Sequence, residues 1–169
     1  MSSLLTLTPA EFCDVTAACR EGCDWAITQP TMADVWDYCP RSQWLLWILD
    51  KLSQRPDNRT LWLFAAWCVR NTPLGDARVM GDLITDPRLL AALELTERYA
   101  EGKATEEQLC AAYATCAPAF VSAACAVAVA LGYAEEAATP CARANARRVQ
   151  ADQLRRMISN PFRREGGAS

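Results

Sequence analysis

The stretch from Gln108 to Ala134 carries no charged side chain over 27 consecutive residues. A run of this length exceeds the roughly 20 residues that a helix needs to cross a bilayer. Alanine dominates the run, Pro118 interrupts it and no basic flank anchors it, so its preference for lipid is weak. We therefore expect a buried helical hairpin or a kinked core helix, and no membrane span.

Helix start and stop signals punctuate the rest of the chain. The segment Thr8-Pro9-Ala10-Glu11 places a capping threonine before a first-turn proline and a glutamate, and it predicts a helix over 9–27. Thr105 and Gln108 form a second capping box. Further helices are predicted over 32–38, 40–52, 61–69, from Asp86-Pro87 to Gly102, and over 139–158. No alternating pattern typical of strands competes, so the predicted fold is an all-α, compact multi-helix bundle of about eight helices.

Length and composition predict one domain. A chain of 169 residues with 51% hydrophobic residues has enough apolar content for one core and too few residues for two domains of typical size. We expect a single helical domain over 1–164 and a flexible tail over 165–169, which ends in Gly-Gly-Ala-Ser. The first seven residues lack the basic region of a secretory signal or a transit peptide, which predicts a cytoplasmic protein.

The nine cysteines raise the question of a metal or redox site. None of them forms a CxxC pair, the spacing that structural zinc sites favour. Cys19 and Cys23 are four residues apart, but they fall on the same predicted stripe as Phe12 and Ile27. Cysteine on such a stripe behaves as a small hydrophobe. The sequence therefore predicts reduced, mostly buried cysteines and no metal, with metal or redox chemistry as the alternative.

Signs of catalytic chemistry are few. The chain has no histidine, and it has no glycine-rich loop of the GxxxxGK or GxGxxG type. Carboxylates gather at Asp34 and Asp37, and again at Asp76, Asp82 and Asp86, but helix carboxylates more often serve solvation and capping than catalysis. We expect a non-enzymatic protein without cofactors. A small enzyme that uses cysteines and carboxylates is the alternative.

Several segments of the chain share a pattern with a known group of proteins. They are Leu63-Phe64-Ala65 before Trp67-Cys68; Leu83 to Arg88; Ala91, Glu94, Glu97 to Ala100, Gly102, Ala104, Thr105 and Glu107; Gln150 to Arg155; and Asn160-Pro161-Phe162-Arg163. Together they span about 61–164 and resemble a family of uncharacterised helical bacterial proteins, some of them carried by phages. The resemblance implies a helical fold and no activity, cofactor or site residue. The chain departs from the family's pattern at 110–134, where the family has an alanine-rich helix containing arginine.

Charge is distributed unevenly along the chain. Residues 1–138 hold 18 acidic and ten basic side chains, a net charge of −8, whereas 139–169 hold seven arginines and two acids, a net charge of +5. An acidic body repels a phosphate backbone, so binding to nucleic acid would be confined to the basic end.

Two groups of residues are candidates for binding a partner. Trp25 falls on the acidic side of its predicted helix, where an exposed tryptophan would be suited to anchoring an interface. Arg148 and Arg155 share a helix face, and Arg156 follows. We expect a macromolecule-binding protein whose partner is a host protein, with binding of nucleic acid through the arginines as the alternative. The resemblance to phage-borne proteins suggests an inhibitor of a host antiviral defence component, such as one of CRISPR.

Overall fold

A computed structural model of the chain describes residues 4–117, 122–137 and 139–163, and helices dominate all three ranges. Within them the chain forms nine α-helices, three short 3-10 helices and one isolated β-bridge, between Pro73 and Val79. The predicted all-α class is confirmed. The elements are η1 (Leu4–Thr6), α1 (Pro9–Thr16), α2 (Arg20–Ala26), α3 (Met32–Tyr38), α4 (Ser42–Lys51), α5 (Asn58–Asn71), η2 (Met80–Leu83), α6 (Pro87–Ala100), α7 (Glu106–Cys116), α8 (Ala123–Gly132), η3 (Tyr133–Glu136) and α9 (Pro140–Met157).

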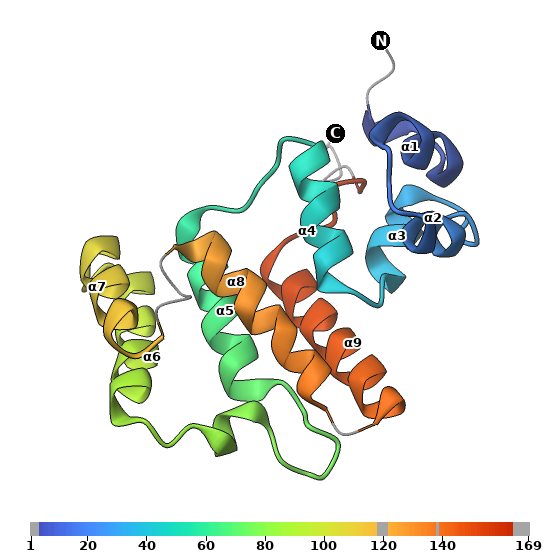
Figure 1. Cartoon of the computed structure of the whole chain (residues 1–169). Helices are drawn as coiled ribbons and strands as arrows, with labels where there is room; N and C mark the ends of the chain where they lie inside the picture. Colours follow the sequence, from blue (N-terminus) through green and yellow to red (C-terminus); the bar gives the residue numbers. More distant parts are fainter. Residues whose placement is uncertain (1–3, 118–121, 138, 164–169) are drawn as a thin grey trace.

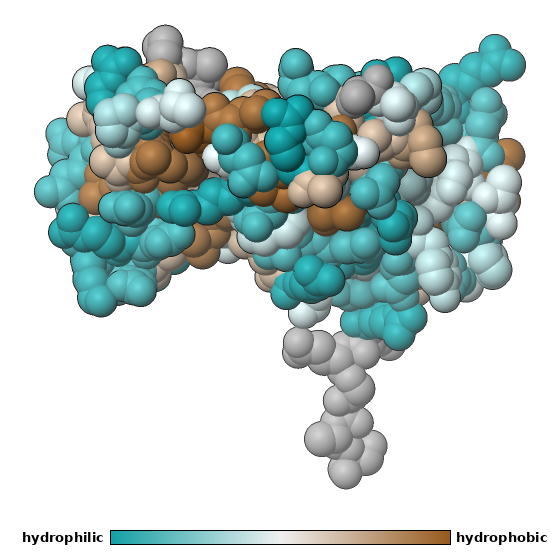
Figure 2. All heavy atoms as spheres, turned by 90° about the horizontal axis from the view of Figure 1, so that it is seen from below, coloured by the Kyte–Doolittle hydropathy of each residue, from teal (hydrophilic) through white to brown (hydrophobic). Residues whose placement is uncertain are grey.

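Helix α5 lies at the centre of the bundle and packs against α6, α8 and α9 (Figure 1). Helix α4 packs on α9, and α6 pairs with α7. Helices α1, α2 and α3 gather at the end of the molecule opposite α6 and α7 (Figure 1). In a view from below, hydrophilic side chains cover most of the surface, and hydrophobic ones show mainly on the side that carries α6 and α7 (Figure 2).

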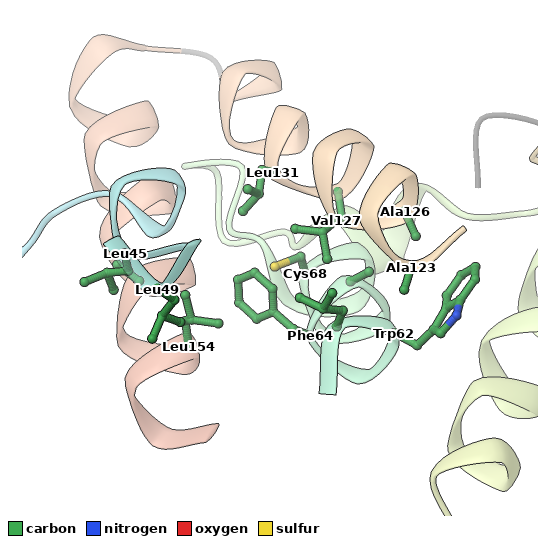
Figure 3. Close-up of a cluster of buried hydrophobic side chains, with 14 of the residues drawn as sticks. Leu45, Leu49, Trp62, Phe64, Cys68, Ala123, Ala126, Val127, Leu131 and Leu154 are labelled. Atoms are coloured by element: carbon green, nitrogen blue, oxygen red, sulfur yellow. The ribbon is translucent and has the colours of Figure 1, made fainter. Parts of the chain in front are cut away.

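The uncharged run forms most of α7 and all of α8, and each of these helices has a buried and an exposed side. Ala123, Ala126 and Val127 of α8 face Phe64 and Cys68 of α5 in the core (Figure 3), and all five are buried. Alanine lets the two helix backbones approach closely. Pro118, which interrupts the run and where a hairpin turn or a kink would be expected, lies outside the described residues. Among the helices that are described, none combines the length and the apolarity needed to cross a membrane.

The predicted caps are present at the starts of the helices. The side chains of Thr8, Asp57, Thr105 and Thr139 each accept a hydrogen bond from the backbone amide three residues later, at 2.7–3.3 Å. Gly102, beyond the end of α6, has a φ of +75°, which glycine adopts without steric cost. Local sequence therefore determines where most helices begin and end.

The single helix predicted over 9–27 is wrong, because the chain breaks between Thr16 and Arg20. Ala17 adopts a left-handed conformation with a φ of +52° and ends α1. The break lets α1 bury Phe12 while α2 buries Ala26, and Cys19 is exposed between the two helices. This division explains why the described residues form nine α-helices where about eight helices were predicted.

A candidate binding site: an aromatic pocket between α1 and α4

A candidate site for a ligand is an apolar pocket of about 280 Å³ formed by residues of α1 to α4 and of the segments between them. Four aromatic side chains supply much of its wall: Phe12, Trp25, Trp44 and Trp47. No lining residue is charged, and Gln43 is the one amide among them. Apolar pockets with a few polar groups are typical of small-molecule sites and of sites that receive a partner's anchor residue.

Ring contacts hold the aromatic wall in place. Trp25 and Trp44 lie with their ring centroids 6.0 Å apart at 37°, and Phe12 meets Trp47 edge to face at 6.1 Å. The Arg41 guanidinium lies 4.7 Å from the Trp44 ring centroid and forms an ion pair with Glu21. Aromatic pairs and cation–π contacts at these distances stabilise one arrangement of the rings. The pocket is therefore pre-formed on the folded protein.

Trp25 was expected to be exposed and free of packing contacts, and the structure differs from this expectation. Trp25 is half-buried, packs against Trp44 and forms part of the pocket wall. Its packing partner, Trp44, lies on α4. Its partial exposure still leaves ring surface at the edge of the pocket.

Three cysteines belong to the pocket wall: Cys13, Cys19 and Cys39. Burial, reinforced by the neighbouring Cys23 thiol, raises the pKa of Cys13 to about 12. Burial raises the pKa of Cys39 to about 11, and its Sγ donates to the Arg41 carbonyl at 3.2 Å. These two thiols are neutral near pH 7 and act as apolar wall groups.

The expectation of mostly buried cysteines is wrong. Three are buried, three are half-buried and three are exposed; in that order they are Cys13, Cys39 and Cys68, then Cys23, Cys110 and Cys116, then Cys19, Cys125 and Cys141. All nine are free thiols. In the part of the chain that the structure describes, no three cysteine or carboxylate side chains come together in an arrangement that would hold a metal ion.

Arg155, a predicted binding residue, has a largely buried side chain that forms hydrogen bonds within the protein. Its side chain is 15% exposed, and Nη1 donates to the carbonyls of Cys39 at 2.8 Å and Trp36 at 3.2 Å. Its Nη2 donates to Asp152 at 2.6 Å. The arginine thus joins α9 to the end of α3. A phosphate would have to displace these acceptors, so Arg155 is poorly placed for a nucleic-acid surface.

Arg148 and Arg156 are the exposed members of the predicted arginine group. Arg148 donates to Asn145 at 2.9 Å and lies 4.0 Å from Asp152. The structure therefore does not bring Arg148, Arg155 and Arg156 together as one free cationic patch.

The Asn-Pro-Phe-Arg segment after α9 binds the N-terminal helices. Asn160 donates to the Ala33 carbonyl at 3.0 Å and to Asp37 at 2.9 Å, and Arg163 also pairs with Asp37. Phe162 meets Phe12 edge to face at 6.1 Å. Because Phe12 lines the pocket, this segment supports the pocket from behind α1.

The clustered carboxylates serve caps and ion pairs. Asp34 accepts a hydrogen bond from Thr31 at 2.6 Å, and Asp82 accepts one from the Val79 amide at 2.9 Å. Hydrogen bonds from Arg78 and Arg88 lower the pKa of Asp76 and of Asp86, respectively. A lowered pKa is the opposite of what a general acid requires near neutral pH. These contacts favour structural roles for the carboxylates.

Sequence reasoning missed most of the pocket. Trp44 and Trp47 stand three residues apart, on one face of α4, but the run from Trp44 to Leu49 is apolar on all sides and predicts a helix buried on every face. In the structure both tryptophans are half-buried. The spacing of the two tryptophans was the available signal, and only the neighbouring helices show that a pocket lies beside them.

Comparisons of the chain with family models, with curated proteins and with solved structures gave no match. The resemblance to phage-borne bacterial proteins therefore stays a prediction.

Proposed function

We propose that this protein is a non-enzymatic binding protein whose aromatic pocket receives a hydrophobic anchor residue from a protein partner. The observation that carries the proposal is the uncharged pocket with Trp25 at its edge and Trp44 and Trp47 in its wall. Tryptophan is enriched among the few residues that supply most of the energy of protein interfaces, where they pair with pockets on the partner.

The exposed acids of α1 and α2, two of the helices that form the pocket, favour a partner with basic residues. Glu11, Asp14, Glu21 and Asp24 are exposed on α1 and α2, and Arg20 and Arg41 pair with two of them. Complementary charge increases the rate of association and the selectivity between partners. The same acidic surface disfavours a nucleic-acid backbone.

The finer part of the proposal concerns the identity of the partner. We propose a host protein of an antiviral defence system, such as a CRISPR component, which binding would inhibit. This part is supported by the resemblance to phage-borne proteins and by the absence of a recognisable catalytic motif from the sequence.

Replacing Trp25 with alanine tests the proposal. A partner identified by pull-down is purified, and its affinity for the wild-type protein and for Trp25→Ala is measured by calorimetry. We expect Kd to increase about 10- to 100-fold, because the variant loses ring surface at the pocket edge. Trp25 also packs against Trp44, so thermal melts must show that the variant is folded at the assay temperature.

The matched control is Tyr38→Ala, which removes an aromatic side chain that is 69% exposed on α3 and does not line the pocket. Its Kd should stay within about twofold of wild type. Equal losses for both variants, or no loss for Trp25→Ala, would contradict the proposal. Tight, salt-sensitive binding of the purified protein to DNA or RNA would favour the nucleic-acid alternative.

A further inference from the structure

The pocket's dimensions and lining define the group that it accepts. An engineered apolar cavity of about 150 Å³ binds benzene. The volume here, about 280 Å³, is nearly twice as large and corresponds to a two-ring system such as indole or naphthalene. A larger ligand would extend out of the pocket into solvent.

The chemistry of the walls favours a neutral aromatic group. The ring faces and edges of Phe12, Trp44 and Trp47 offer stacked and edge-to-face contacts. Met32 and the pocket cysteines offer sulfur–aromatic contacts. No lysine, arginine, aspartate or glutamate lines the pocket, so a charged ligand would lose its hydration without gaining an ionic partner.

One polar contact is available to orient such a group. Gln43 is exposed on α4 and lines the pocket, and its amide is able to accept a hydrogen bond from a ring N–H or hydroxyl. Indole combines two fused rings with one N–H donor.

We infer that the pocket is a binding site for one neutral two-ring aromatic group, supplied, if the proposed function holds, by a tryptophan side chain of the partner protein. A side chain is favoured over a free molecule because the pocket is open to solvent on one side and the exposed acids of α1 and α2 suit basic residues flanking the tryptophan. A fully enclosed cavity would admit only a free molecule.

The first test uses indole, N-acetyltryptophanamide, 2-naphthol and naphthalene-2-sulfonate as probes of the full-length protein. Binding is measured by calorimetry and located by NMR of the Met32 methyl group, which lies in the pocket wall. We expect the neutral probes to bind with Kd values of about 0.1–1 mM, as suits ligands of this size. The sulfonate should bind at least tenfold more weakly than 2-naphthol because of its charge.

Variants that fill the pocket locate the site. Ala18→Phe places a large ring in the pocket wall and should abolish probe binding, while Ala91→Phe, at an exposed alanine of α6, should leave it unchanged. Should Ala18→Phe fail to fold, Gly22→Ala replaces it. The added methyl group would approach the Cys19 Sγ at 3.2 Å and the Trp44 ring at 3.6 Å, and it should weaken probe binding severalfold.

The outcomes separate this inference from the proposed function. Failure of every neutral probe to bind, or equal binding of 2-naphthol and the sulfonate, would overturn the inference. Binding of indole without N-acetyltryptophanamide would overturn the assignment to a partner's tryptophan. Probes that bind in the pocket but do not compete with the purified partner would sustain the aromatic site and contradict the proposed function.

Discussion

Two alanines on α8 differ in burial because they lie on opposite sides of the helix. Ala126 is fully buried against α5, whereas Ala128, two residues later, is exposed. Both belong to the same alanine-rich run, and composition does not distinguish them. The difference in burial decides which of the two tolerates a charge.

Replacing Ala126 with aspartate should lower the free energy of unfolding by about 3–5 kcal/mol, because an unpaired carboxylate would lie in the core. The matched variant Ala128→Asp should cost about 1 kcal/mol or less, since its side chain reaches water. Urea unfolding followed by circular dichroism measures both. Similar values for the two variants would show that α8 does not pack with this face toward α5.

Arg155 and Arg156 are neighbours in sequence that also differ in burial, and we expect them to contribute differently to stability. Arg155→Gln should lower the free energy of unfolding by about 1–3 kcal/mol, because two backbone carbonyls and Asp152 lose a charged donor. Arg156→Gln, at an exposed position, should change it by about 0.5 kcal/mol or less. The two variants are compared by chemical denaturation. If Arg155→Gln left the free energy of unfolding unchanged, Arg155 would again be a candidate for binding a partner at the surface.

At the scale of elements, the break between α1 and α2 shapes the N-terminal end of the molecule. An alanine in the left-handed conformation costs about 1–2 kcal/mol relative to the right-handed helix. The chain accepts this cost at Ala17 because the break lets both helices bury apolar side chains, Phe12 and Ala26 among them. Ala18 and Cys19, which lie in the break, line the pocket.

Ala17→Gly should therefore stabilise the protein by about 0.5 kcal/mol, since glycine adopts a φ of +52° without strain but gains entropy in the unfolded chain. Ala114→Gly, at an exposed position inside α7, should destabilise it by about 1 kcal/mol. Thermal melts of the two variants should shift in opposite directions. A downward shift for Ala17→Gly would mean that the helix continues through Ala17.

For the whole molecule, the pocket is built from the N-terminal helices, and segments distant in sequence hold those helices in place. Its walls come from α1 to α4, Arg155 ties α9 to the end of α3, and the Asn160–Arg163 segment holds α1 and α3. Contacts from the C-terminal segment thus hold the N-terminal helices in place. The packing of the entire chain also sets the exposure of the nine cysteines.

Thiol titration measures this exposure. At pH 8 a disulfide reagent should modify Cys19, Cys125 and Cys141 rapidly, and Cys13, Cys39 and Cys68 only after unfolding. Burial raises the pKa of Cys39 from 9.0 to about 11, so the folded protein retains a proton that the unfolded chain releases. Cys39 should therefore make stability fall as the pH rises from about 9 to 11. Rapid labelling of Cys68 in the folded protein would contradict the core packing.

Local signals in the sequence determined the helical class and most helix ends. Capping side chains such as Thr8, Asp57 and Thr105 act within three residues, so their effect is readable without knowledge of the fold. The helix predicted from Asp86-Pro87 to Gly102 is present as α6, and it buries Ala92, Leu93 and Thr96 on one face. Periodicity identifies an apolar face because one helix turn fixes which residues lie together.

Only the tertiary structure decided the break at Ala17, the pocket and the interior role of Arg155. Each depends on contacts between residues far apart in the chain: Arg155 reaches carbonyls at positions 36 and 39, and Trp25 packs against Trp44. The sequence pattern singles out each side chain, Trp25 on an acidic helix face and Arg155 in an arginine group. Whether that side chain meets solvent or a neighbouring helix is determined by packing, which acts across the whole fold.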